Sequence, residues 1–220
     1  MPDFAARPQL AEDVAGFVRR RIFDGTYAAG TYVRLDQLAA ELGISVTPVR
    51  EALFELKAEG LLDQQPRRGF VVRPVTVRDV ADVSDVQAYI GGELTARAAA
   101  NISETQLGEL ARIQTELEAA YGADDGERAV RLNHEFHRAI NVAADSPKLA
   151  QLMSQITRYA PESVFPTISG WPEKSNVHHR RILAALGARD ESAARSAMSE
   201  HLAAGADPLI DHLTQRGVIE

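Results

Sequence analysis

Three histidines lie at positions where their side chains can meet. His137, His179 and His201 each fall on the apolar stripe of a segment with helical periodicity, so all three face the inside of a helical bundle. Asn133 lies one turn before His137 and shares its face. Imidazole nitrogens together with a carbonyl oxygen suit zinc, nickel or a similar divalent ion. These four residues therefore form a candidate metal site.

Two other interpretations of the histidines stay open. They can be separate buried residues, each satisfied by a backbone carbonyl or a neighbouring side chain. A metal held by three histidines with an open position can also activate water, which would make the chain a metal-dependent enzyme. A hydrolase of this kind needs a general base near the metal, and Glu135 faces away from Asn133 and His137.

Arginines mark a second region of the chain. Arg50 lies near the start of an apolar-periodic segment, and Arg67 and Arg68 lie in a Pro-Arg-Arg-Gly turn between two alternating runs. Guanidinium groups bind phosphate oxygens and guanine edges, so these arginines are candidates for contact with DNA. Taken alone, arginines on short helices and turns are most often a solvated charged face.

The segment 34–56 gives these arginines their context. Two short apolar stripes, over 35–42 and 49–56, are separated by Gly43, which supplies the left-handed backbone that ends a helix. Ser45 or Thr47 can accept from the free amides that begin the next helix. This is a helix-turn-helix, whose second helix enters the DNA major groove with its N-terminal residues first. Those residues are Ser45, Val46, Thr47, Val49 and Arg50.

The flanking segments complete a winged helix. Residues 9–23 keep helical spacing and stop at Asp24-Gly25, which predicts a first helix. Residues 57–73 leave the helix at Gly60 and alternate as two short strands around the turn at 66–69, which predicts a β-hairpin wing. A hairpin tip with two arginines and Gly69 can lie along the sugar-phosphate backbone or reach the minor groove.

After Pro74 the pattern is helical throughout. The predicted fold is mainly α, with an N-terminal winged helix-turn-helix of three helices plus a β-hairpin wing, followed by an all-α bundle of about six helices. The predicted domains are 1–74 and 75–220. We expect the six helices at 76–101, 103–121, 124–144, 146–165, 171–187 and 190–214.

Size and composition restrict the class of protein. The chain has 220 residues, 45% of them hydrophobic, which is enough for real cores. Residues 1–75 carry ten basic and ten acidic side chains, so the net charge of -7 lies wholly in residues 76–220. The absence of cysteine excludes disulfides and thiolate metal sites. No apolar run resembles a membrane span or a signal peptide, so we expect a cytoplasmic protein with no membrane partner.

Three motifs resemble those of the GntR family of bacterial transcription regulators. They are Ser45-Val-Thr-Pro-Val-Arg-Glu-Ala-Leu53, Glu59-Gly-Leu-Leu62 and Arg67-Arg-Gly-Phe-Val-Val72. Val46 stands where an arginine is often found, and Asp36 where some members have a DNA-contacting arginine. The resemblance implies that the Thr-Pro-x-Arg turn and the glycine wing touch DNA. By position these residues are Thr47, Pro48, Arg50, Arg68 and Gly69, with Ser45 beside them.

The second region resembles the all-helical ligand-binding domain called FCD, of the FadR subfamily. Its motifs are Asn133-x-x-Phe136-His137, His179-Arg-Arg-Ile182 and Ala197-Met-Ser-Glu-His201. Many members bind a metal through an aspartate and three histidines at these positions. The resemblance implies a divalent metal, zinc or nickel, at Asn133, His137, His179 and His201.

The resemblance also implies an effector site on the first helix of this domain. Members of the family often place an arginine one turn before a glutamate there, where it pairs with an effector carboxylate. This sequence has Tyr89 ahead of Glu93. A tyrosine cannot form the bidentate charged clamp, so a carboxylate effector would depend more on the metal.

The function implied by the resemblance is a ligand-responsive, sequence-specific transcription regulator and not an enzyme. Repression is the commoner outcome in the family. The expected partners are a double-stranded DNA operator, a small-molecule effector such as an organic acid, and a second copy of the chain, because one winged helix contacts only a few base pairs. DNA binding is expected in residues 1–74, and effector binding and dimerisation in residues 75–220.

Overall fold

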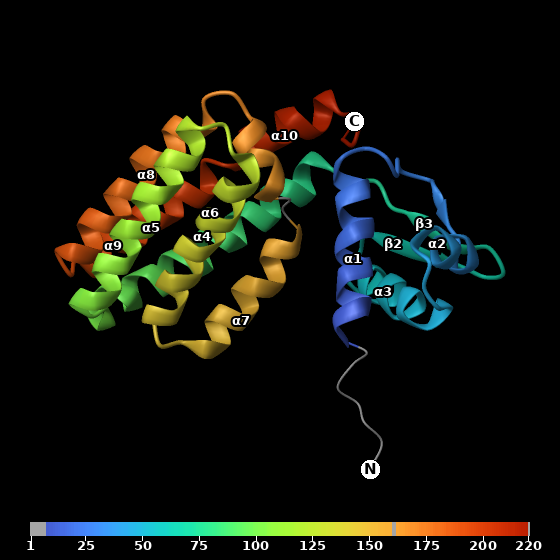
Figure 1. The fold of residues 1–220 in the computed structure, drawn as a ribbon, viewed down its shortest axis with the longest axis horizontal. Coiled ribbons are helices and arrows are strands. Elements are labelled where there is room, and N and C mark those ends of the chain that lie inside the picture. The colour runs from blue at the N-terminus through green and yellow to red at the C-terminus, as the bar shows by residue number, and fades with distance from the viewer. Residues whose placement is uncertain (1–7, 160–161, 220) are drawn as a thin grey trace, which may run out of the picture. The chain divides into compact units, whose positions relative to one another are not determined.

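The computed structural model describes residues 8–159 and 162–219 (Figure 1). Within these residues the chain divides into two compact units. The first consists of residues 8–77 together with 211–219, and the second of the described residues between 78 and 210. None of the helices in the described part of the chain combines the length and the hydropathy needed to cross a bilayer.

The first unit is a winged helix-turn-helix, as the sequence predicts. Arg19 on its first helix donates from Nε and Nη2 to the Glu59 carboxylate, at 3.2 and 2.7 Å, which joins the first helix to the end of the third. The strands are antiparallel in the order β1-β3-β2. The elements are α1 (Pro8–Phe23), β1 (Tyr32–Val33), α2 (Leu35–Leu42), α3 (Val46–Ala58), β2 (Leu62–Gln65) and β3 (Gly69–Val72).

The turn between α2 and α3 follows the predicted chemistry with one difference. Gly43 has a φ of 66°, and its amide donates to the carbonyl of Ala40 at 3.3 Å, so the glycine ends α2 as expected. Ser45 is the N-cap residue of α3, but its side chain makes no capping hydrogen bond, which corrects the expectation for this serine. The first amides of α3 are therefore open to other acceptors.

Residues 211–219 pack in the first unit, whereas the sequence predicts that they belong to a second domain over 75–220. Leu213 and Ile219 are buried. A Cβ placed on Gly25, just after α1, would lie 2.9 Å from the carbonyl oxygen of Arg216. Gly25 has a φ of 81°, so this glycine both turns the chain and lets the C-terminal segment approach.

The second unit is an all-helical bundle. In Figure 1 and in the packing contacts, α5 lies between α6 and α8, and α9 lies against α8. Ser103 begins α5 with a reciprocal capping box, accepting from the amide of Gln106 while its own amide donates to the Gln106 side chain. The elements are α4 (Val77–Asn101), α5 (Glu104–Gly122), α6 (Gly126–Ala143), α7 (Pro147–Ile156), the 3-10 turns η1 (Thr157–Tyr159) and η2 (Glu162–Thr167), α8 (Trp171–Gly187), α9 (Glu191–Ala203) and the first half of α10 (Ala206–Gln215), whose residues from 211 onward belong to the first unit.

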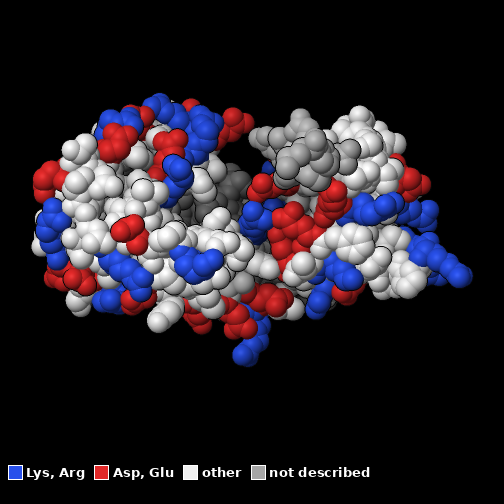
Figure 2. Space-filling view, turned by 90° about the horizontal axis from the view of Figure 1, so that it is seen from below, with Lys and Arg blue, Asp and Glu red and all other residues white. Residues whose placement is uncertain are grey.

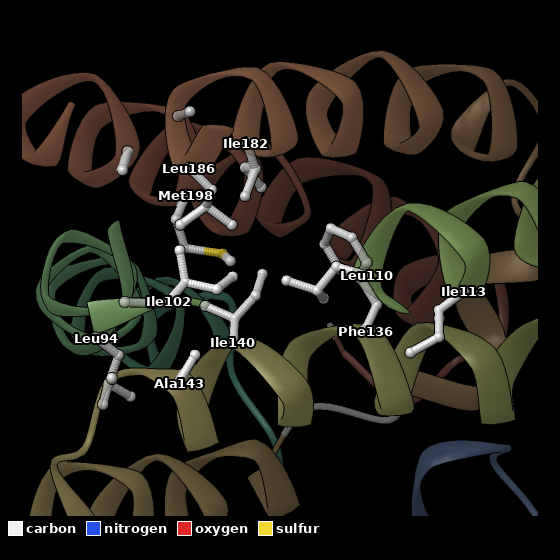
Figure 3. Close-up of a cluster of buried hydrophobic side chains, with 14 of the residues drawn as sticks. Leu94, Ile102, Leu110, Ile113, Phe136, Ile140, Ala143, Ile182, Leu186 and Met198 are labelled. Atoms are coloured by element: carbon white, nitrogen blue, oxygen red, sulfur yellow. The ribbon is translucent and has the colours of Figure 1, made fainter. Parts of the chain in front are cut away.

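One apolar core fills this bundle (Figure 3). Apolar residues recur every three to four positions, so each helix presents one stripe to the interior. A Cβ placed on Gly92 would lie 3.1 Å from the carbonyl oxygen of Arg195, so this glycine brings α4 close to α9. The core side chains labelled in Figure 3 include Leu94, Leu110, Ile140, Ile182 and Met198.

The helix predicted over 146–165 is shorter than expected. The α-helix ends at Ile156 and continues as two 3-10 turns. Thr157 Oγ1 donates to the carbonyl of Met153 at 3.2 Å, and this side-chain bond competes with the backbone hydrogen bonds of the helix. Further along, Pro166 lies inside η2 and has no amide hydrogen to donate to a helical hydrogen bond.

The helix predicted over 190–214 is divided at Gly205 into α9 and α10. A Cβ on Gly205 would lie 3.3 Å from the rings of both Phe165 and Trp171. The glycine lets these aromatic rings reach the backbone at the break, and all three residues line the cavity described below.

Candidate functional site

The structure brings the three predicted histidines together. His137 comes from α6, His179 from α8 and His201 from α9. Nε2 of His201 lies 3.3 Å from Nε2 of His179 and 3.3 Å from Nε2 of His137. The three candidate ligand nitrogens all lie within 4.8 Å of one another. The three imidazoles are therefore grouped at one point, as the metal-site interpretation requires.

Packing fixes these imidazole rings. The ring of Phe136 stacks on that of His179 with centroids 4.2 Å apart and planes 9° apart. His179 and His201 are buried, whereas His137 is half-buried and faces a cavity. The cluster therefore has a dry side in the core and a side that small molecules can reach.

Gln114 on α5 determines which nitrogen of His179 carries the proton. Its side-chain nitrogen donates to Glu118 and to Asn176, each at 3.1 Å, so its oxygen points toward His179. That oxygen lies 2.7 Å from Nδ1 of His179 and accepts its proton. Nε2 of His179 is then left with its lone pair directed at His201, as a metal ligand needs.

Burial also favours the uncharged form of His179 and His201. Desolvation, followed by the neighbouring imidazoles, lowers the pKa of His179 well below the ordinary histidine value. The same causes, with His137 and His178 as the neighbours, lower the pKa of His201 well below that value. Neutral imidazole is the form that binds metal ions, so the donor set fits a borderline divalent cation.

A cavity of about 630 Å³ opens beside the cluster, which is within the usual size of a small-molecule site. His137, His201 and Asn133 lie on its wall, and Phe165 and Trp171 form an aromatic part of it. Among the described residues, Arg138 is the one arginine or lysine in the lining. The remaining polar lining consists mostly of amides and hydroxyls, from residues including Gln87, Asn141, Gln151, Ser154 and Thr157.

Tyr89 is placed differently from the sequence-based expectation. Tyr89 is 71% exposed and does not line the cavity; α4 contributes Ser84 and Gln87 instead. His134 is exposed and also forms part of the cavity wall.

The predicted DNA-contacting residues lie on α3 and on the hairpin of the first unit. Ser45, Thr47 and Arg50 are exposed in the first turns of α3, whereas Pro48 is buried against the core. Among the residues that the structure describes, no ion-pair partner is found for Arg50 or for Arg67 and Arg68 at the hairpin tip, whereas Arg73 after β3 pairs with Asp63.

The hairpin presents a basic tip. Arg67 and Arg68 are exposed between β2 and β3, and Arg67 has a positive φ of 63°. Figure 2 shows Lys and Arg side chains at the end of the first unit where this hairpin lies in Figure 1. The fold itself also requires glycine at position 69, because a Cβ there would lie 2.7 Å from the carbonyl oxygen of Val33.

Sequence reasoning missed Gln114. It is a polar residue on the apolar stripe formed by Leu110, Ile113 and Leu117, and it is buried. That polar interruption is a signal in the sequence, but its partner His179 lies on a helix 65 residues away.

Each of the two units contains a match to a known protein family. Residues 10–72 match the model for bacterial regulatory proteins of the gntR family, and residues 82–204 match the FCD domain. A probable D-xylose utilization operon transcriptional repressor of Paenarthrobacter nicotinovorans is 30% identical over 200 residues, covering 90% of this chain and 88% of that protein. The HTH-type transcriptional regulator McbR of Escherichia coli (strain K12) is 26% identical over 195 residues, covering 87% and 88%.

The fold is shared with a solved structure over almost its full length. The structure of E. coli McbR/YncC superposes with a TM-score of 0.73 at 25% identity, covering 92% of this chain and 97% of that one. These relatives are transcription regulators, so the alternative of a metal-dependent enzyme is wrong. The chain belongs to the GntR family of bacterial regulatory proteins, with an FCD domain after its helix-turn-helix, and is a ligand-responsive DNA-binding transcription regulator.

Proposed function

We propose that this regulator is a repressor that binds its operator as a homodimer and is controlled by an organic acid held beside a divalent metal. The observation that carries this proposal is the convergence of three imidazoles beside a cavity that His137 and His201 line, in a chain that also has a winged helix. The cavity gives a small molecule direct access to His137 and His201.

The metal site would consist of His137, His179, His201 and Asn133. Three imidazoles with one oxygen ligand suit zinc or nickel. Asn133 supplies a neutral carbonyl oxygen where a carboxylate would neutralise charge, so the bound cation keeps more of its positive charge. When bound, the metal would act as a Lewis acid that attracts an effector carboxylate.

The effector would occupy the cavity next to the cluster. Arg138 can pair with an anionic group, while the amides and hydroxyls of the lining can bond to hydroxyl groups. The relative from P. nicotinovorans is named for D-xylose utilization, so pentoses and sugar acids are the first compounds to test.

On DNA, Arg50 would contact a guanine or a phosphate at the leading end of α3, with Ser45 and Thr47 on phosphates. Arg67 and Arg68 would contact the backbone from the hairpin, where Gly69 keeps the approach open. Two copies of the chain would contact two half-sites. An effector that binds better to a dimer whose heads do not match the operator spacing would release the DNA.

Metal analysis tests the site. Protein purified without chelator or nickel resin should hold about one zinc or nickel per chain, and His137→Ala and His179→Ala should lose it. His134→Ala is a matched control, because His134 lines the same cavity but is not part of the cluster. Absence of metal from all four folded proteins would contradict the proposal.

Substitution of Arg50 tests the recognition helix. Arg50→Ala should abolish operator binding in an anisotropy titration and leave the dimer intact in sedimentation. Arg131→Ala is the control, because Arg131 is exposed on α6 in the other unit. Operator affinity unchanged by Arg50→Ala would count against the assignment of α3.

A further inference from the structure

An apolar side chain leads the recognition helix. Val46 is the first residue of α3, directly after the N-cap Ser45, and its side chain is 36% exposed. Its surface neighbours Thr47 and Arg50 are polar and also exposed. This end of the helix is the end expected to enter a DNA groove, so the exposure of an apolar side chain there needs a chemical explanation.

The geometry of α3 keeps Val46 on the surface. Val46, Arg50 and Phe54 follow one another at intervals of four, so they share one stripe of the helix. Phe54 is 43% exposed and packs edge-on against Phe70, with centroids 5.4 Å apart. The opposite stripe of α3 is buried in the core, so the helix cannot roll to bury Val46; it consists of Val49, Ala52, Leu53 and Leu56.

The chemistry of the major groove limits what Val46 can contact. A helix-turn-helix places the N-terminal residues of its second helix against base edges. Valine has no hydrogen-bonding group, and the one apolar group on the major-groove edges is the C5-methyl of thymine. Against other bases the isopropyl group would cover a polar edge without pairing it, which costs binding free energy.

We propose that Val46 contacts a thymine methyl and thereby selects thymine at one position in each operator half-site. The inference rests on the proposed assignment of α3 as the recognition helix. It adds a specificity contact next to Arg50, which lies one turn further along the same stripe. The order along the helix places the selected thymine beside the base or phosphate that Arg50 contacts.

The test uses a change of a single methyl group in the DNA. Selection from a random duplex pool with the full-length protein first gives the preferred site. Each thymine of that site is then replaced by deoxyuridine, which removes only the C5-methyl, and affinity is measured by fluorescence anisotropy. At the contacted position the wild type should bind about fourfold more weakly, the free energy of burying one methyl group.

The protein side of the test is Val46→Ala. This variant should bind the thymine site more weakly than the wild type does and should no longer distinguish thymine from deoxyuridine at that one position. Val177→Ala, at an exposed valine on α8, should keep the wild-type discrimination. If Val46→Ala and the wild type lose equal affinity at every thymine, the inference is overturned while DNA binding by α3 stands. If the wild type selects no DNA at all, both the proposed function and the inference fail.

Discussion

At the scale of single residues, the histidine cluster depends on a side chain that is not itself one of the candidate metal ligands. Gln114 is held by Glu118 and Asn176, and Glu118 in turn accepts from Nε and Nη2 of Arg180, at 2.9 and 2.7 Å. This chain of contacts ends at Nδ1 of His179. Because the proton on Nδ1 leaves Nε2 free to bind, the orientation of one amide prepares the cluster for a cation.

We therefore expect Gln114→Ala to weaken metal binding by about ten- to a hundredfold, the usual cost of losing a residue that orients a ligand. Competition with a fluorescent zinc chelator measures the affinity. Gln155→Ala is the control, because Gln155 is exposed on α7 and is not in the cavity lining. Thermal melts in chelator separate folding from binding, and wild-type zinc affinity in folded Gln114→Ala would refute this role.

The sequence predicts the three histidines of the cluster but not Gln114, and this difference has a physical reason. His137, His179 and His201 could be found because each falls on the apolar stripe of its own helix, which is local information. Their 3.3 Å contacts depend on how α6, α8 and α9 pack, and so does the contact made by Gln114. For Tyr89 the sequence-based expectation is wrong: the resemblance implies an effector-binding role, but Tyr89 lies on the exposed face of α4 and does not line the cavity.

At the scale of elements, the contact between α4 and α9 depends on two glycines. A Cβ on Gly91 would meet Leu202, and one on Gly92 would meet Ser199 and the Arg195 backbone. Since α9 carries His201, the close packing of these helices also determines where that imidazole lies.

Gly92→Ala should destabilise the helical unit by about 1–3 kcal/mol, because the added methyl overpacks a contact that includes backbone. Gly108→Ala on α5 is the matched control; apart from its chain neighbours and the backbone of its own helix, nothing lies within 4 Å of its Cβ position, so it should be neutral or stabilising by up to about 1 kcal/mol. Urea unfolding followed by circular dichroism gives both values. Equal stability of the two variants would show that the α4–α9 contact can relax.

The helix boundaries show what local sequence can predict. Gly43 and the Ser103 capping box lie where the periodicity breaks, and both act through neighbouring residues only. The break at Gly205 cannot be found in this way, because it accommodates Phe165 and Trp171 from distant parts of the chain.

At the scale of the whole molecule, charge is distributed unevenly along the chain. The net charge of -7 comes entirely from residues 76–220, while the first 75 residues are neutral overall. Acidic and basic side chains alternate over the helical unit in Figure 2. Contact with phosphates therefore depends on the local arginines of the first unit and not on the total charge.

Operator binding should for this reason weaken steeply with salt despite the acidic chain. In a homodimer, Arg68→Ala should lower the slope of log affinity against log salt concentration by about two, close to one for each lost phosphate contact. Titrations at several potassium chloride concentrations measure the slope. Arg131→Ala on α6 should leave it unchanged. A wild-type slope in Arg68→Ala would place the hairpin away from the DNA backbone.

The position of Trp171 has a spectroscopic consequence. It is the single tryptophan of the sequence, it lines the cavity, and its ring centroid lies 6.0 Å from that of His201. Its emission is therefore an intrinsic optical signal from the cavity of the unlabelled protein. Nickel, with a partly filled d shell, should quench this emission on binding at the cluster, whereas zinc, with a filled shell, should leave its intensity nearly intact. A shift of the emission maximum would then follow the arrival of an effector in the same cuvette.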